Sequence, residues 1–227
     1  MTPFILKTLL AAHITGGVIA FLCAGGALVS KKGRTGHRFF GKGYVAGMTA
    51  VFLSALPLAF FQANLFLLLI AFFSFYLVFS GFRFARNKTG APGAQDWIAV
   101  GFAVLSGVGM WGLGYFFFMT GNDQWVTLIV FGTLGALLGV SDGAAWIKGA
   151  LAGRKRIARH LTNMLAGTIS TVTAALVVNV TTNPPWIAWI APTIVITPFI
   201  IYWSRRTLSA GYNRQKRQIK NGRGERI

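Results

Sequence analysis

Residues 65–82 read LFLLLIAFFSFYLVFSGF and contain no charged side chain. A helix needs about 20 mostly apolar residues to cross the hydrocarbon core of a bilayer, so this stretch predicts a membrane-spanning helix. Its leucine, phenylalanine and isoleucine residues would cover every side of that helix. We therefore expect residues 65–82 to face lipid over much of their surface.

Six further apolar stretches lie on either side of this one, separated by short polar or basic segments. They cover residues 9–29, 44–61, 97–119, 125–147, 160–180 and 186–203. The chain is 54% hydrophobic and only 11% charged, whereas soluble domains carry roughly 25% charged residues. The sequence thus predicts an all-α fold, a polytopic transmembrane bundle of about seven helices.

The distribution of basic residues predicts how the bundle is oriented. Of the 22 lysines and arginines, all except Lys7 fall in residues 31–42, 83–88, 148–159 and 205–226. Seven spans would place these four segments on one side of the membrane, and basic residues concentrate in cytoplasmic loops. We therefore expect the N-terminus to lie outside and the C-terminus in the cytoplasm. Tryptophans at the expected span ends agree with an interfacial aromatic belt: Trp97, Trp125, Trp146, Trp186 and Trp203.

The last part of the chain is a separate basic segment. We divide the chain into a transmembrane domain, residues 1–204, and a basic cytoplasmic tail, residues 205–227. The net charge of +18 is explained by the positive-inside distribution rather than by binding of nucleic acid. Besides the lipid bilayer, we expect the tail to meet anionic lipid or an acidic protein partner, because both attract clustered lysines and arginines.

Ionisable residues inside a membrane are costly and are therefore candidates for function. His13 lies in the outer half of the first span, and Asp142 lies near the inner end of the fifth. The other candidates lie near the expected cytoplasmic edge, and Met164 shares a helical face with His160. The full set of candidate polar, proton or ligand residues is His13, His37, Arg38, Asp142, Arg159, His160 and Met164.

Each candidate also has a purely structural interpretation. His13 could bind haem, a metal or a proton, or could simply bond to a neighbouring helix. Asp142 could form a proton or cation site, or an ion pair with Arg156 or Arg159 that joins the fifth and sixth helices. From shared depth and opposite charge we expect an inner-edge cluster of His37, Arg38, Asp142, Arg159 and His160.

Two groups of smaller residues predict packing rather than chemistry. Glycines in the first and fourth spans are typical of close helix contacts, and the hydroxyl-rich stretch 168–173 is typical of side chains that bond to their own backbone. The glycines are Gly16, Gly17, Gly25, Gly26, Gly107, Gly109, Gly112 and Gly114.

Several stretches together resemble a bacterial family of multi-pass membrane proteins of unknown function (domain of unknown function 2306). They are HITGG at 13–17, HRFFGKGY at 37–44, Asp142, RIARHLTNM at 156–164 and VVN at 177–179. The similarity covers most of the chain and implies a polytopic protein of the bacterial inner membrane, with the candidate residues at motif positions. It implies no activity, and the tail from about Arg214 is an addition to the pattern.

Two classes of function remain open. The sequence has no P-loop, GxSxG, HExxH or dinucleotide motif and only four acidic residues, which favours a non-catalytic membrane component. Such a component would be an accessory subunit of a larger complex or a small transporter. The alternative is an electron-transfer protein that binds haem b or copper through His37 and His160 at the inner edge. His13 lies about 20 Å from these two histidines along the membrane normal, by helix rise, and so could not bind the same haem or copper ion.

Overall fold

The protein is a bundle of seven helices within residues 3–149 and 151–224, the residues that the computed structural model describes. Side chains are described through residue 209. All seven helices are long and apolar enough to cross a membrane, so this is a multi-pass membrane protein, as predicted. The helices are α1 (Pro3–Val29), α2 (Thr35–Phe61), α3 (Leu65–Arg86), α4 (Ala94–Met119), α5 (Trp125–Ile147), α6 (Gly153–Asn179) and α7 (Trp186–Gly224).

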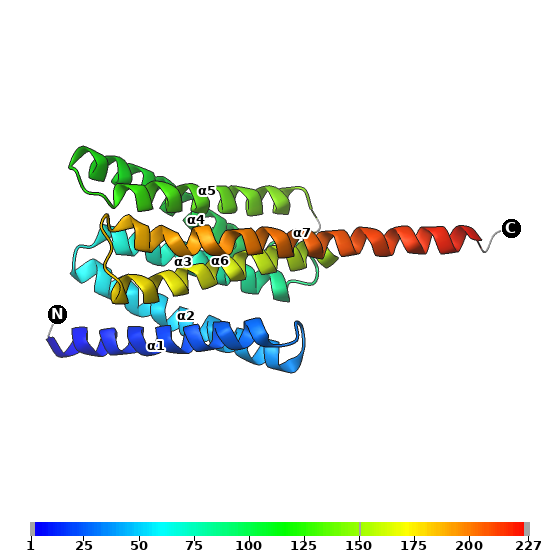
Figure 1. Cartoon of the computed structure of the whole chain (residues 1–227), viewed down its shortest axis with the longest axis horizontal. Coiled ribbons are helices and arrows are strands. Elements are labelled where there is room, and N and C mark those ends of the chain that lie inside the picture. Colours follow the sequence, from blue (N-terminus) through cyan, green and yellow to red (C-terminus); the bar gives the residue numbers. More distant parts are fainter. Residues whose placement is uncertain (1–2, 150, 225–227) are drawn as a thin grey trace.

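Successive helices run up and down beside one another, with short turns between them (Figure 1). The α1–α2 hairpin flanks the bundle on one side and the α4–α5 hairpin on the other, with α3 and α6 between them. The loops 30–34 and 87–93, the end of α5 and the start of α6 lie at the same end as the C-terminal part of α7. We call this the basic end, because it carries the basic segments, and call the other the opposite end.

Local signals explain where the helices begin and end. The side chain of Asn64 accepts a hydrogen bond from Leu67 N at 3.0 Å and so caps the start of α3. Gly121, in the turn before α5, has a φ of +72°, a conformation that glycine adopts at little cost. After α1, the Lys32 amine donates hydrogen bonds to the carbonyls of Ala27 and Leu28 and so satisfies the end of that helix. Because the amine is partly buried in this position, its pKa is lowered.

The expectation that residues 65–82 face lipid was wrong. Helix α3 packs against α2, α4, α5 and α6 and is the central helix of the bundle. Its residues Phe73, Tyr76 and Leu77 form the main core together with residues of α4 and α5. In a bilayer, apolarity does not separate a lipid-facing surface from a protein-facing one, so the sequence pattern alone misplaced this helix.

Two of the basic segments are helical over much of their length. Helix α2 begins at Thr35 rather than near Tyr44, and α6 begins at Gly153 rather than at His160. His37 and Arg38 therefore lie in the first turn of α2, and Arg156 and Arg159 lie in the first two turns of α6. Helix α7 continues past residue 205 without a break to Gly224. The last residues of the predicted tail, 225–227, lie outside the described part of the chain.

Glycines form two close contacts between neighbouring helices. A Cβ atom on Gly47 would lie 2.8 Å from the carbonyl oxygen of Gly16, and one on Gly107 would lie 2.7 Å from that of Gly132. The predicted packing role therefore holds for Gly16 and Gly107. By contrast, nothing lies within 4 Å of a Cβ built on Gly112.

Candidate functional site

The polar interior of the bundle is concentrated where the first turns of α6 meet α3 and α5, near the basic end. Charged and amide side chains at 156, 159, 160 and 163 point from one helix to three different neighbours. Residues three and four apart lie on the same side of a helix, which explains how Arg159 and Asn163 both reach α5. We call these residues and their partners the α6 cluster.

Asp142 is the most deeply buried charged side chain of this cluster, with 1% of its surface exposed. One carboxylate oxygen accepts hydrogen bonds from the Tyr76 hydroxyl at 2.7 Å and from Asn163 Nδ2 at 2.9 Å. The other accepts from Arg159 Nη1 at 2.9 Å. A buried carboxylate is tolerated only when paired and hydrogen-bonded, and Asp142 of α5 meets both conditions with partners from α3 and α6.

Arg159, and not Arg156, is the partner of Asp142. Its guanidinium also donates to the Ser141 hydroxyl and, at 3.3 Å, to the Ser141 carbonyl oxygen. The predicted ion pair between the fifth and sixth helices therefore forms. An intact buried ion pair adds little to the free energy of unfolding. Removal of one partner lowers it strongly, because the other charge is left buried without compensation.

Arg156 instead binds the C-terminal end of α3. Its Nη1 atom donates to the carbonyl oxygens of Phe84 at 2.6 Å and Ala85 at 2.5 Å. One turn earlier in α3, the carbonyl oxygen of Gly81 pairs with His160 Nδ1 at 2.8 Å. The last four carbonyls of a helix lack intrahelical partners and carry partial negative charge, so Arg156 binds groups that α3 itself leaves open. His160 adds a second link to α3 through a carbonyl inside the helix.

His37 and His160 lie next to one another, although they are far apart in the sequence. Their ring centroids are 6.3 Å apart and their planes are nearly perpendicular, at 86°. His37 Nδ1 pairs with the carbonyl oxygen of Ala27 at 3.1 Å. Met164 follows His160 by one turn and its sulfur lies against Gly81. The structure thus brings the two inner histidines together, with Met164 beside the glycine whose carbonyl binds His160.

The other two candidates lie apart from these groups. Arg38 is exposed at the surface of the basic end. His13 lies towards the opposite end, where its Nδ1 pairs with the carbonyl oxygen of Val51 at 3.2 Å and the Ser54 hydroxyl at 3.1 Å. His13 therefore makes the contacts expected of a structural histidine that joins α1 to α2.

A second ion pair was not foreseen from the sequence. Arg83, near the end of α3, binds both carboxylate oxygens of Asp96 at 2.7 and 2.8 Å. Asp96 also accepts from Gly93 N at 2.8 Å at the start of α4. The sequence does not reveal this partner of Asp96, because the pairing depends on which neighbouring helix faces it.

Sequence reasoning also missed three members of the α6 cluster, namely Tyr76, Ser141 and Asn163. Asn163 carried a detectable signal, since it is an amide one turn after Arg159 on the same helical side. Tyr76 lies within the most apolar stretch of the chain and carried none. In the described part of the chain, the buried side-chain polar atoms without a hydrogen-bond partner are Asn163 Oδ1 and Thr173 Oγ1.

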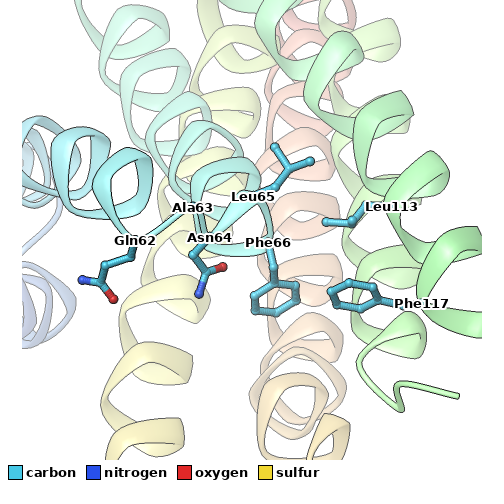
Figure 2. A pocket seen from close by; sticks show the side chains of 7 residues that line it. All are labelled: Gln62, Ala63, Asn64, Leu65, Phe66, Leu113 and Phe117. Atoms are coloured by element: carbon cyan, nitrogen blue, oxygen red, sulfur yellow. The ribbon is translucent and has the colours of Figure 1, made fainter. Parts of the chain in front are cut away.

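The hollows on the surface are shallow. One, of about 250 Å³, lies at the opposite end around the α2–α3 turn. Figure 2 shows the rings of Phe66 and Phe117 beside one another there, with the amide of Gln62 pointing away from them. Apolar side chains and two amides offer little to acid–base or metal chemistry. A second hollow, of about 480 Å³, lies at the basic end around the α3–α4 loop. We place the candidate site in the α6 cluster and the adjoining histidine pair because the buried, hydrogen-bonded polar side chains meet there.

The site shows buried ion pairing and hydrogen bonds that join helices. Within residues 3–149 and 151–224, no three His, Cys, Asp or Glu side chains are grouped so that they could hold a metal ion. A metal at the histidine pair would therefore need a ligand of another kind.

No family model, no curated protein and no solved structure matches this chain.

Proposed function

We propose that the protein is a non-catalytic component of a bacterial inner membrane, an accessory subunit that docks an acidic protein through the extension of α7. The proposal includes membership of the family that the sequence resembles, with the basic end in the cytoplasm. The observation that carries it is the length of α7, which comprises 39 residues. A span takes about 20 of them, so the remainder extends about 30 Å beyond the bundle at 1.5 Å per residue.

The α7 extension, residues 205–224, leaves the bundle in line with its own span (Figure 1). Contacts with α6 support this exit direction, because Thr162 and Ser204 share a hydroxyl hydrogen bond at 3.0 Å and Arg154 donates to the Thr207 carbonyl oxygen at 3.3 Å. The extension is thus fixed at its base and stands away from the other helices.

The charge of the extension favours a partner of opposite sign. Residues 205–224 carry basic side chains and no acidic one. Like charges on neighbouring turns destabilise an isolated helix, so an acidic surface would both bind the extension and stabilise it. Complementary charge also speeds and directs association between proteins.

Geometry favours a protein over the lipid surface as the binding partner. Attraction to anionic lipid decays within a Debye length, about 8 Å at physiological ionic strength. A helix that continues in line with its span carries most of its basic residues farther than that from the bilayer. Only the first turn, with Arg205 and Arg206, remains within reach of lipid headgroups.

Crosslinking in intact cells tests the proposal. In one variant, the distal basic residues of α7 are replaced by glutamine: Arg214, Lys216, Arg217, Lys220 and Arg223. A matched control neutralises the same number of residues in the other basic segments: Lys31, Lys32, Arg34, Lys42 and Lys88. We expect one protein adduct to be formed by the natural chain and the control and lost from the α7 variant. An adduct that persists in the α7 variant contradicts the proposal.

The lipid alternative is tested separately in nanodiscs. A spin label at Asn213→Cys, in a chain with Cys23→Ser, reports the depth of the extension relative to the bilayer. We expect the same water-exposed signal with neutral phosphatidylcholine and with added phosphatidylglycerol. A label that moves to the bilayer surface only with the anionic lipid would favour lipid binding and contradict protein docking.

A further inference from the structure

We propose that His37 and His160 bind one copper(I) ion at the basic end, with the thioether of Met164 as a third ligand. The site is independent of the α7 extension and of its docking role. It uses two neutral nitrogens and one neutral sulfur, a ligand set that suits a soft, monovalent ion.

The spacing of the two rings fits a shared ion. A bond from metal to imidazole nitrogen is about 2 Å long, so two rings that bind one ion from opposite sides have centroids about 6 Å apart. The observed separation is 6.3 Å. One ring comes from the first turn of α2 and the other from the second turn of α6, so the ion would join two helices that touch through their side chains.

Backbone contacts prepare both rings for this role. Nδ1 of His37 faces the Ala27 carbonyl and Nδ1 of His160 faces the Gly81 carbonyl. A carbonyl can only accept, so each Nδ1 carries the proton and each Nε2 keeps its lone pair. The same arrangement orients most metal-bound histidines in proteins.

The methionine adjoins the pair through a shared neighbour. A Cβ built on Gly81 would lie 2.8 Å from Met164 Sδ, and the carbonyl of the same glycine binds His160. Met164 also follows His160 by four residues and so lies on the same side of α6. Because Gly81 faces the Nδ1 side of His160, a change of side-chain rotamer would have to bring the thioether round to the ion on the Nε2 side.

The charge around the pair favours copper(I) over a divalent ion. Arg156 lies one turn before His160 on the same side of α6, and the nearby carboxylate of Asp142 is already paired with Arg159. A dication would meet a fixed positive charge without a free carboxylate to offset it. A monovalent ion with neutral ligands meets less repulsion.

Packing below the pair favours an ion over haem. Tyr44 and Val78, which are 2% and 0% exposed, pack in one cluster with Ala20, Ala24 and Met164. A porphyrin between the two histidines would have to displace these side chains. A single ion needs only the space between the rings, and both histidines are partly exposed, so it can enter from the basic end.

Competition with a copper(I) chelator tests the site in the purified full-length protein under reducing conditions. We expect one copper(I) per chain, with affinity reduced about 100-fold in His37→Gln and in His160→Gln, and about tenfold in Met164→Leu. His13→Gln is the matched control, because His13 also binds a backbone carbonyl but lies towards the opposite end. Its affinity should equal that of the natural chain.

X-ray absorption of the copper-loaded natural protein keeps the test independent of how the variants fold. We expect two nitrogen scatterers at about 2 Å and a sulfur scatterer that disappears in Met164→Leu. A natural protein that fails to bind copper(I), or whose spectrum lacks imidazole, overturns the proposal. Equal affinity in His37→Gln, His160→Gln and His13→Gln overturns it as well.

Discussion

Helices α1 and α3 are both apolar enough to cross a membrane, yet they occupy opposite positions in the fold. In the spanning window of α1 17% of the residues are buried, whereas in that of α3 39% are buried. Leu22 of α1 is 66% exposed and Leu77 of α3 is 1% exposed. The more apolar of the two helices is the one that lipid touches less.

The difference shows what selects the central helix of this bundle. Lipid tails are as apolar as leucine, so an apolar face gains little by packing on protein instead of lipid. Helix α3 is held by polar anchors: the Tyr76 hydroxyl on Asp142, and the carbonyls that bind Arg156 and His160. Helix α1 contacts mainly α2, through the close approach of Gly16 and the hydrogen bonds of two histidines, and none of its described residues forms a buried ion pair.

The largest effect is expected from breaking the anchor at Asp142. In Asp142→Ala the guanidinium of Arg159 loses its counter-charge, and Tyr76 and Asn163 lose their acceptor. We expect a loss of about 3 kcal/mol in the free energy of unfolding, measured by denaturant titration in detergent micelles. Asp123→Ala, at an exposed turn, is the control and should change stability little. Equal stability of the two variants would show that α3 does not depend on the α6 cluster.

A second test compares the same substitution in the two helices. Leu77→Ala leaves a cavity in the protein interior, and we expect it to cost about 2 kcal/mol. Leu22→Ala changes a side chain that faces lipid, and its effect should be close to zero. Thermal unfolding of both variants measures the difference. A larger loss for Leu22→Ala would reverse the assignment of core and periphery.

The smallest expected effect concerns the glycine contacts. Gly107→Ala places a methyl group against the backbone of α5, and we expect it to cost about 1 kcal/mol because the helices must shift apart. Gly112→Ala, where a Cβ meets nothing within 4 Å, should be neutral or slightly stabilising, because alanine has the higher helix propensity. Denaturant titration of the pair distinguishes a packed face from an open one.

Much of the fold could be predicted from the sequence because a span has a length and composition that lipid imposes. The number of helices and the grouping of the basic loops followed from this. Which helices lie side by side in the membrane plane did not follow, since the residues that decide this are far apart in the sequence. The alternation of apolar and polar faces that orients a helix in a soluble protein is missing from a helix such as α3.

The candidate site was predictable in part for the same reason. The depth of a residue along the membrane normal can be counted from the sequence, so the pairing of Asp142 with Arg159 could be predicted. The contacts of Tyr76 with Asp142 and of His37 with His160 depend on how helices are rotated and which ones are neighbours. Those relations join residues 66 and 123 positions apart, and no local pattern encodes them.

We propose above that the basic end, with the α7 extension, faces the cytoplasm. Labelling of single cysteines with a membrane-impermeant maleimide in intact cells tests it most directly, in a chain whose Cys23 is replaced by serine. Thr181→Cys, exposed at the opposite end, should be labelled at once, and Asn213→Cys, in the α7 extension, only after the membrane is permeabilised. Labelling of Asn213→Cys in intact cells together with protection of Thr181→Cys would contradict the orientation and the docking role that depends on it.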